Sequence, residues 1–179
     1  MAKVKRYSLH METINKYRES NPAIRDAVVC FIQKDDKVLL GVRKTSSSNL
    51  GINRVAGLGG KLEAGETKEQ ALVRELQEEV GVTLTEFKER GQVTFLYPHS
   101  PAWNQDVTVY VGTKWEGELT ETEETCPSWF NKSELPMDRM FTENRLWVPQ
   151  VLEGQHVNAV FLFDESNQVK ESRIEFPQF

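Results

Sequence analysis

Three glutamates, Glu75, Glu78 and Glu79, have a spacing that gathers their carboxylates on one side of a helix. Residues three and four positions apart are neighbours on a helical surface, so these side chains are expected to lie together. Carboxylates at such close range repel one another unless a cation neutralises them. Clustered oxygen ligands are what Mg²⁺ or Mn²⁺ prefers. The spacing therefore predicts a divalent-metal site on this helix.

The alternative is an ordinary acidic helix whose glutamates face solvent and form a few ion pairs. Arg74 fits this alternative, because it precedes Glu78 by four residues and is placed to pair with it. The same helix has an apolar stripe that predicts docking on a core, formed by Leu72, Val73, Leu76 and Val80.

Residues around the helix favour the metal site. Gly59 and Gly60 precede the helix, Glu66 lies in the turn before it, and Gly81 follows its end. A merely solvated face needs none of them. Agreement between the turn chemistry and the carboxylate spacing indicates a functional site.

The surrounding segments predict an α/β protein, with a mixed sheet flanked by helices. The glutamate helix is expected over Lys68–Val80. A second helix is expected over Thr142–Leu152, broken or kinked by Pro149, with Leu146, Val148 and Val151 facing inward. Strands are expected at Asp26–Gln33, Val38–Lys44, Arg54–Leu58, Gly91–Tyr97, Gln105–Trp115, Thr125–Phe130, Val157–Phe163 and Val169–Phe176.

The chain is expected to form one domain over residues 25–179, preceded by an N-terminal extension over residues 1–24. The extension is weakly helical around Met11–Arg18 and is expected to pack on the body or on a partner. The polar stretch Thr45–Asn53 is either a ligand-facing loop or a plain connector.

The composition, with 39% hydrophobic and 27% charged residues among 179, is typical of a soluble globular protein. A net charge of −5 argues against a nucleic-acid partner. Cys30 lies in an apolar run and is expected to be buried; neither it nor Cys126 has metal-type spacing, so a reduced, cytoplasmic setting is expected. No segment has the length of a signal peptide or a membrane span. Nothing in the pattern specifies an oligomeric state.

Residues 60–82, GKLEAGETKEQALVRELQEEVGV, resemble the Nudix box, G-x5-E-x7-R-E-U-x-E-E-x-G-U, where U is aliphatic. With residue frequencies near ~7%, a chance match at a given start is roughly one in a billion. Every fixed position is filled, by Gly60, Glu66, Arg74, Glu75, Leu76, Glu78, Glu79, Gly81 and Val82.

Further segments resemble the MutT branch of this superfamily, and within it the animal hydrolases of oxidised purine nucleoside triphosphates. They are VLLGVRK, GLGGKLEAGET, GQVTF, CPSWF, ELPMDRMF, Trp147-Val148-Pro149 and VNAVFLFD. The resemblance implies an α/β/α sandwich that acts on a small-molecule nucleotide substrate. It also implies hydrolysis of a nucleoside triphosphate to the monophosphate and pyrophosphate, by water, with Mg²⁺ present.

The resemblance also implies roles for individual residues. Glu66 would pair with Arg74 and hold the loop and helix in shape. The metal ligands would be the Gly59 carbonyl, Glu75, Glu78, Glu79 and Glu124, and the general base would be Glu78, Glu79 or Glu124.

The purine base would stack among aromatic residues that could equally be core packing: Phe95, Tyr97, Phe141 and Trp147. Arg43 and Lys61 are candidates for phosphate contacts, although surface charges need no such role.

The match departs from the animal enzymes at the base-reading positions. Ala56 stands where they have asparagine, Glu143 and Asn144 where they have two aspartates, and Phe141 where they have tryptophan. Glu143 can accept a hydrogen bond from a purine edge, and Asn144 can donate and accept. Changes of this kind shift discrimination by orders of magnitude. Both 8-oxo-dGTP and unmodified dGTP are therefore expected candidates.

Two other functions compete. One keeps the chemistry but acts on another nucleoside diphosphate-linked substrate, such as a nucleotide sugar, ADP-ribose or an RNA 5′ end; the acidic balance argues against RNA. The other is a regulator that binds a nucleotide without hydrolysis. That function predicts an eroded box, and the box is intact.

Overall fold

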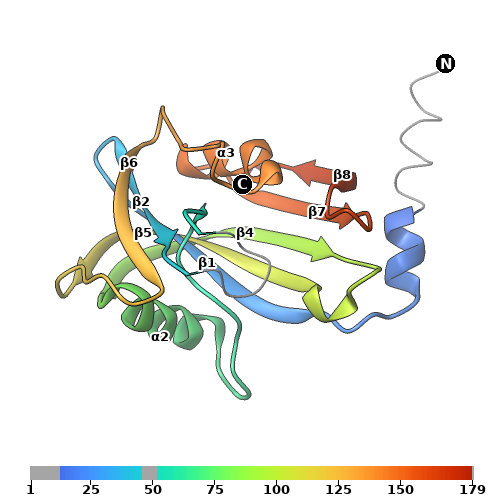
Figure 1. Cartoon of the computed structure of the whole chain (residues 1–179), viewed down its shortest axis with the longest axis horizontal. Coiled ribbons are helices and arrows are strands. Elements are labelled where there is room, and N and C mark those ends of the chain that lie inside the picture. Colours follow the sequence, from blue (N-terminus) through green and yellow to red (C-terminus); the bar gives the residue numbers. More distant parts are fainter. Residues whose placement is uncertain (1–12, 46–51, 179) are drawn as a thin grey trace.

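The computed structural model describes residues 13–45 and 52–178. One mixed sheet runs through the molecule in the order β3-β2-β1-β5-β4-β7-β8, with β6 paired to β2 (Figure 1). Its strands are β1 (Arg25–Lys34), β2 (Lys37–Arg43), β3 (Val55–Ala56), β4 (Thr83–Leu96), β5 (Gln105–Glu116), β6 (Thr125–Asn131), β7 (Val157–Phe163) and β8 (Val169–Glu175). β1 runs parallel to β5, and β4 parallel to β7, whereas the other pairs are antiparallel.

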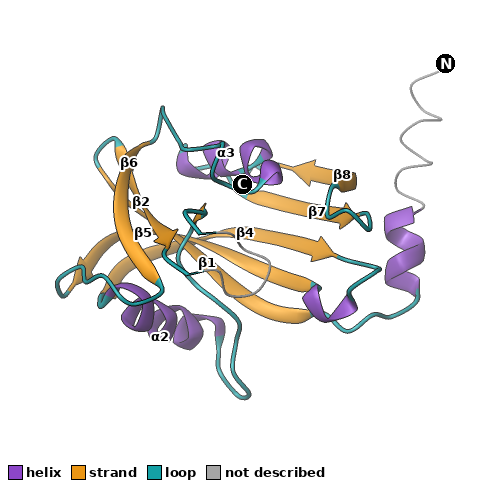
Figure 2. Cartoon of the chain, in the orientation of Figure 1, coloured by secondary structure: helices purple, strands orange, loops and turns teal. Residues whose placement is uncertain are grey.

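Helices cover both faces of the sheet, as Figure 2 shows, which confirms the predicted α/β architecture. Helix α2 (Lys68–Val80) packs on one face and α3 (Val148–Leu152) on the other. A hydrophobic core lies on each face of the sheet, and β1 contributes side chains to both because successive strand residues point to opposite faces. Cys30 contributes to the α2 side and Phe31 to the α3 side. The predicted burial of Cys30 is confirmed, since it is 0% exposed.

Local chemistry sets the ends of α2, which has the predicted bounds. Thr67 caps the N-terminus by accepting from the Gln70 N–H, and the Gln70 side chain accepts from the Thr67 N–H in return. Gly81 ends the helix with φ 74°, a left-handed conformation that suits glycine. The predicted stripe is confirmed at Leu72, Leu76 and Val80, but Val73 is 37% exposed, so its inclusion was wrong.

The predicted second helix is two short elements. A 3₁₀ segment, η2 (Thr142–Leu146), precedes α3, and Trp147 between them is not helical. Pro149 lies in the first turn of α3, where its missing N–H costs nothing. Val148 and Val151 are buried as predicted, whereas Leu146 is 43% exposed. The prediction for Leu146 was wrong because the 3₁₀ turn shifts the helical phase.

Most strand predictions are confirmed within a residue or two, with two exceptions. β3 is shorter than the predicted Arg54–Leu58, and Leu58 forms only an isolated bridge with Cys30. β4 begins at Thr83 rather than Gly91, because register shifts against β5 interrupt the alternation of its first half. The predicted loop Thr45–Asn53 falls largely on residues 46–51, outside the described residues.

The described part of the N-terminal segment packs on the body of the protein. Residues 13–19 are helical, and Ile14 is buried against Leu96 and Leu162. The Asn104 side chain donates to the Tyr17 hydroxyl at 3.0 Å, which ties this helix to the end of β5. Residues 1–12 lie outside the described range, and the boundary after residue 24 stays a prediction. Among the described helices, none is long and apolar enough to cross a membrane.

Candidate active site

Arg74 joins the loop before α2 to the helix itself. Its Nε and Nη2 atoms donate to the two oxygens of Glu66 at 2.7 and 2.9 Å, and Nη2 also donates to the Lys61 carbonyl at 3.0 Å. This is the ion pair that the resemblance to the Nudix family implied. The Arg74 hydrogen bonds and the Glu63 N–H hold the pKa of Glu66 down at about 2. The loop is therefore fixed against α2 by a two-pronged, charge-assisted contact.

Arg74 also contacts two of the three clustered glutamates. Its Nη1 donates to Glu75 at 2.9 Å and to Glu78 at 3.3 Å, the latter being the predicted i,i+4 pair. The Glu75 side chain is 16% exposed, and burial raises its pKa. Glu78 is different, because its side chain is 60% exposed.

Glu79 is hydrogen-bonded to the glycine turn. Its Oε2 accepts a hydrogen bond from the Gly59 N–H at 2.8 Å. Burial raises the pKa of Glu79 to about 7, and the neighbouring charges of Glu75 and Glu124 act in the same direction. The carboxylate of Glu75 lies against Gly60 so closely that a Cβ there would approach its Oε2 to 2.7 Å. The turn thus brings Gly59, Gly60, Glu75 and Glu79 together.

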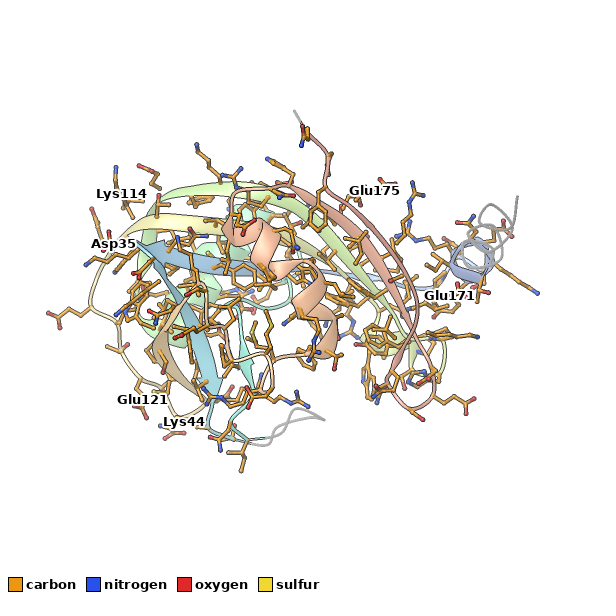
Figure 3. All side chains as sticks on the ribbon, turned by 90° about the horizontal axis from the view of Figure 1, so that it is seen from above. Asp35, Lys44, Lys114, Glu121, Glu171 and Glu175 are labelled. Atoms are coloured by element: carbon orange, nitrogen blue, oxygen red, sulfur yellow. The ribbon has the colours of Figure 1, made fainter. Side chains whose placement is uncertain are left out.

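A second connection holds the acidic segment before β6 beside the end of β2. The Lys44 N–H donates to the Glu124 carbonyl at 2.9 Å, and the Lys44 ammonium pairs with Glu121 at 2.5 Å, the two labelled side chains that meet at one edge of Figure 3. These contacts place Glu124 near Arg43 and within electrostatic reach of Glu79. A residue some 45 positions beyond the helix, in a different element, therefore joins the acidic cluster.

The donor chemistry of this cluster fits a hard divalent cation. Its atoms are carboxylate and carbonyl oxygens, and burial raises the pKa values of two of its carboxylates, Glu75 and Glu79, so a nearby cation would favour their charged forms. Within residues 13–45 and 52–178, no three acidic, histidine or cysteine side chains are arranged to hold one ion. The reason is visible in the hydrogen bonds: Arg74 holds Glu75 and Glu78, and the Gly59 N–H holds Glu79. The predicted gathering of all three glutamates is thus only partly present.

A cavity of about 300 Å³ opens beside this cluster. Its wall includes the charged residues Arg43, Lys61 and Glu79 together with aromatic residues. Eight of the predicted site residues line it: Arg43, Gly59, Lys61, Glu79, Phe95, Phe141, Asn144 and Trp147. A cavity lined by aromatic rings and by charged side chains suits a ligand in which a flat ring is joined to an anionic group.

Two residues predicted at the base pocket lie elsewhere. Tyr97 stacks on Phe163, with ring centroids 4.4 Å apart and planes at 7°, and is not on the cavity wall. Glu143 is 6% exposed and is also absent from that wall; burial raises its pKa. Their contact with a substrate stays a prediction.

The sequence prediction missed one residue on the cavity wall, Gln105, and one that supports the wall, Arg54. Gln105, the first residue of β5, lines the wall. Arg54 lies over the Phe141 ring at 5.6 Å and donates to the Met140 carbonyl at 3.0 Å, so it fixes that aromatic side chain. Strand alternation could have suggested Gln105, because Val107 on the same face is apolar. No local pattern indicates Arg54.

The chain belongs to the Nudix family, since the NUDIX domain model matches residues 23–151. It is 32% identical to the oxidized purine nucleoside triphosphate hydrolase of Danio rerio over 81% of this chain and 90% of that protein. The hydrolase of the same name from Mus musculus is 30% identical over 78% of this chain and 86% of that protein. The 8-oxo-dGTP diphosphatase of Escherichia coli is 32% identical over 58% and 77%. The protein is therefore a Nudix hydrolase, a family that generally uses divalent metals.

Solved structures agree with the fold. A MutT protein from Bacillus halodurans superimposes with a TM-score of 0.71 at 21% identity, covering 85% of this chain and 98% of that one. A MutT Nudix hydrolase from Burkholderia pseudomallei gives 0.62 at 24% identity, covering 72% and 98%. At these identities the likeness establishes the fold alone.

Proposed function

We propose that this protein hydrolyses purine nucleoside triphosphates, such as 8-oxo-dGTP or dGTP, to the monophosphate and pyrophosphate with Mg²⁺ bound. Mn²⁺ is the alternative metal. The observation that carries the proposal is the shared cavity wall, on which Glu79 of the box and the preceding Gly59 join the aromatic Phe95, Phe141 and Trp147. The names of the animal relatives support a purine triphosphate as the substrate class.

The metal would be held by oxygens of the acidic cluster: the Gly59 carbonyl, Glu75, Glu78, Glu79 and Glu124. Bound metal neutralises phosphate charge and lowers the pKa of a coordinated water. Arg74 and Glu66 position this set, because their ion pair fixes the turn that carries Gly59 relative to α2. Proton removal from the attacking water falls to Glu78, Glu79 or Glu124, whichever carboxylate keeps a free oxygen.

The chain's other residues bind and orient the nucleotide. Phe95, Phe141 and Trp147 enclose the base and exclude water from that end of the cavity. Arg43 and Lys61 lie on the same wall as Glu79 and offer positive charge to the phosphates. Asn144, 7% exposed, supplies a donor and an acceptor beside the base. Glu143 and Tyr97 would support the residues that line the cavity, because they are not on its wall.

A side-by-side substrate panel tests the proposal. It measures kcat/KM with Mg²⁺ for 8-oxo-dGTP, dGTP, dATP, ADP-ribose and a triphosphorylated RNA. The proposal expects a purine nucleoside triphosphate to lead by tenfold or more. A lead for ADP-ribose or RNA would move the same chemistry to another substrate class.

Glu79→Gln separates an enzyme from a binding regulator. Losing a positioned charged group at the reacting centre lowers kcat by about a hundredfold or more. Glu69→Gln is the matched control, because Glu69 lies in the first turn of the same helix, outside the acidic cluster. Equal rates in wild type and Glu79→Gln would refute the assignment of the acidic cluster as the catalytic site.

A further inference from the structure

Gln105 presents an amide to the aromatic part of the cavity. It pairs with Phe95 across the β4–β5 ladder and with Arg25 of β1. Phe95 and Val107 both lie on the cavity wall, and residues two apart in a strand share a face. The register therefore directs the Gln105 side chain toward the cavity, whose wall it forms.

The Gln105 amide has no partner among the described residues. No hydrogen bond of its side chain occurs there, although the residue is only partly exposed. By contrast, the side chain of Gln33 on β1 is hydrogen-bonded, since its Nε2 donates to the Leu152 carbonyl at 3.1 Å. Among the described residues, the buried side-chain atoms that lack a partner do not include those of Gln105, so the amide is accessible from the cavity and can pair with a bound molecule.

The groups around Gln105 indicate which part of a nucleotide it meets. Its cross-strand neighbour is aromatic, and Phe141 and Trp147 also form the wall of this cavity. An amide beside rings that enclose a flat group lies at the edge of that group. A carboxamide carries an acceptor and two donors, so it can form paired hydrogen bonds with a base edge.

We propose that Gln105 hydrogen-bonds the edge of the nucleobase and determines which base the enzyme prefers. The inference rests on the proposed function and adds a specificity-determining residue to it. Bases differ in what they present: guanine has two acceptors at N7 and O6, whereas adenine has an acceptor at N7 and a donor at N6. Oxidation of guanine at C8 converts N7 into an N–H donor. One amide pairs differently with each of these edges.

The test is the binding of monophosphates, which needs no turnover. Titration calorimetry measures the Kd of 8-oxo-dGMP, dGMP, dAMP and dCMP for wild type and for Gln105→Met, which keeps the side-chain size and removes both hydrogen-bonding functions. Gln105→Glu is the second variant, because it keeps the acceptor and loses the donors. Gln92→Met is the matched control: Gln92 is on β4, pairs with Thr108 and is not on the cavity wall.

A base-reading role predicts that the ratio of Kd values between at least two bases changes by about tenfold or more in Gln105→Met. Gln105→Glu should change the ratios in a different pattern, and Gln92→Met should leave them as in wild type. The inference would be overturned if Gln105→Met weakened the binding of all four nucleotides equally. Unchanged ratios of Kd values between the bases in both Gln105 variants would overturn it as well. Absence of binding by the wild-type protein would overturn it too. Failure of the proposed function would instead appear as normal binding without turnover of the triphosphates.

Discussion

Replacing Gly60 with alanine should lower activity strongly while leaving the fold intact. A Cβ at this position would approach Glu75 Oε2 to 2.7 Å, and Oε1 more closely still, so the carboxylate must retreat by about 1 Å to reach ordinary contact at 3.4 Å. A displacement of about 1 Å at a catalytic group costs about a hundredfold in rate. We therefore expect kcat/KM to fall about 100-fold, equivalent to about 2.7 kcal/mol of transition-state stabilisation.

The stability of the Gly60→Ala protein should change little. Gly60 does not have a left-handed backbone, so alanine is tolerated there and restricts the unfolded chain. Gly65 provides a control with the opposite pattern: its φ is 85°, and nothing lies within 4 Å of a Cβ there. Gly65→Ala should lose about 1–2 kcal/mol of stability, or about 2–4 °C of Tm per kcal/mol, and keep its activity.

Steady-state kinetics with a purine triphosphate and thermal unfolding of both variants complete the comparison. Wild-type kcat/KM in Gly60→Ala would show that the Glu75 carboxylate can move without consequence, and would rule out its role at the catalytic site. A large loss of Tm in that variant would show that the glycine serves the fold instead.

Three further predictions concern the Glu66–Arg74 ion pair, the stacking of the base on Phe141, and the divalent metal. Glu66, with a folded pKa of about 2 against an ordinary value of 4.5, contributes stability that is present above pH 4.5 and lost as pH falls toward 2. Urea unfolding of Glu66→Gln should therefore show a deficit at pH 7 that disappears across that window; a constant deficit would contradict the Arg74 pairing. Phe141→Ala should raise KM more than it lowers kcat, whereas unchanged KM would return Phe141 to a packing role. Chelation with EDTA should abolish turnover and added Mg²⁺ restore it, and full activity in EDTA would exclude the metal site.

The part of the site that the sequence predicted best is the part made by local rules. Helix α2 has its predicted bounds because Thr67 and Gly81 are capping residues, and spacing alone places Arg74 beside Glu78. Glu66 reaches Arg74 across a short loop of the same segment. The bounds of α2 and these ion pairs are therefore determined by residues within one continuous stretch of the chain.

The features that could not be predicted from the sequence depend on contacts between distant segments. Gln105 is at the cavity because β5 pairs with β4, and Arg54 is placed by Phe141 and Met140, which come some 86 residues later. Leu146 was misread because the 3.6-residue period does not hold through η2. Register, 3₁₀ phase and long-range side-chain contacts are set by tertiary packing.

The identity of the products tests the proposed hydrolysis directly. The purified protein is incubated with 8-oxo-dGTP or dGTP and Mg²⁺, and the products are separated by anion-exchange chromatography. We expect the nucleoside monophosphate together with pyrophosphate, formed by wild type and by Glu69→Gln but not by Glu79→Gln. Formation of the diphosphate and orthophosphate, or no product from any purine triphosphate, would contradict this expectation.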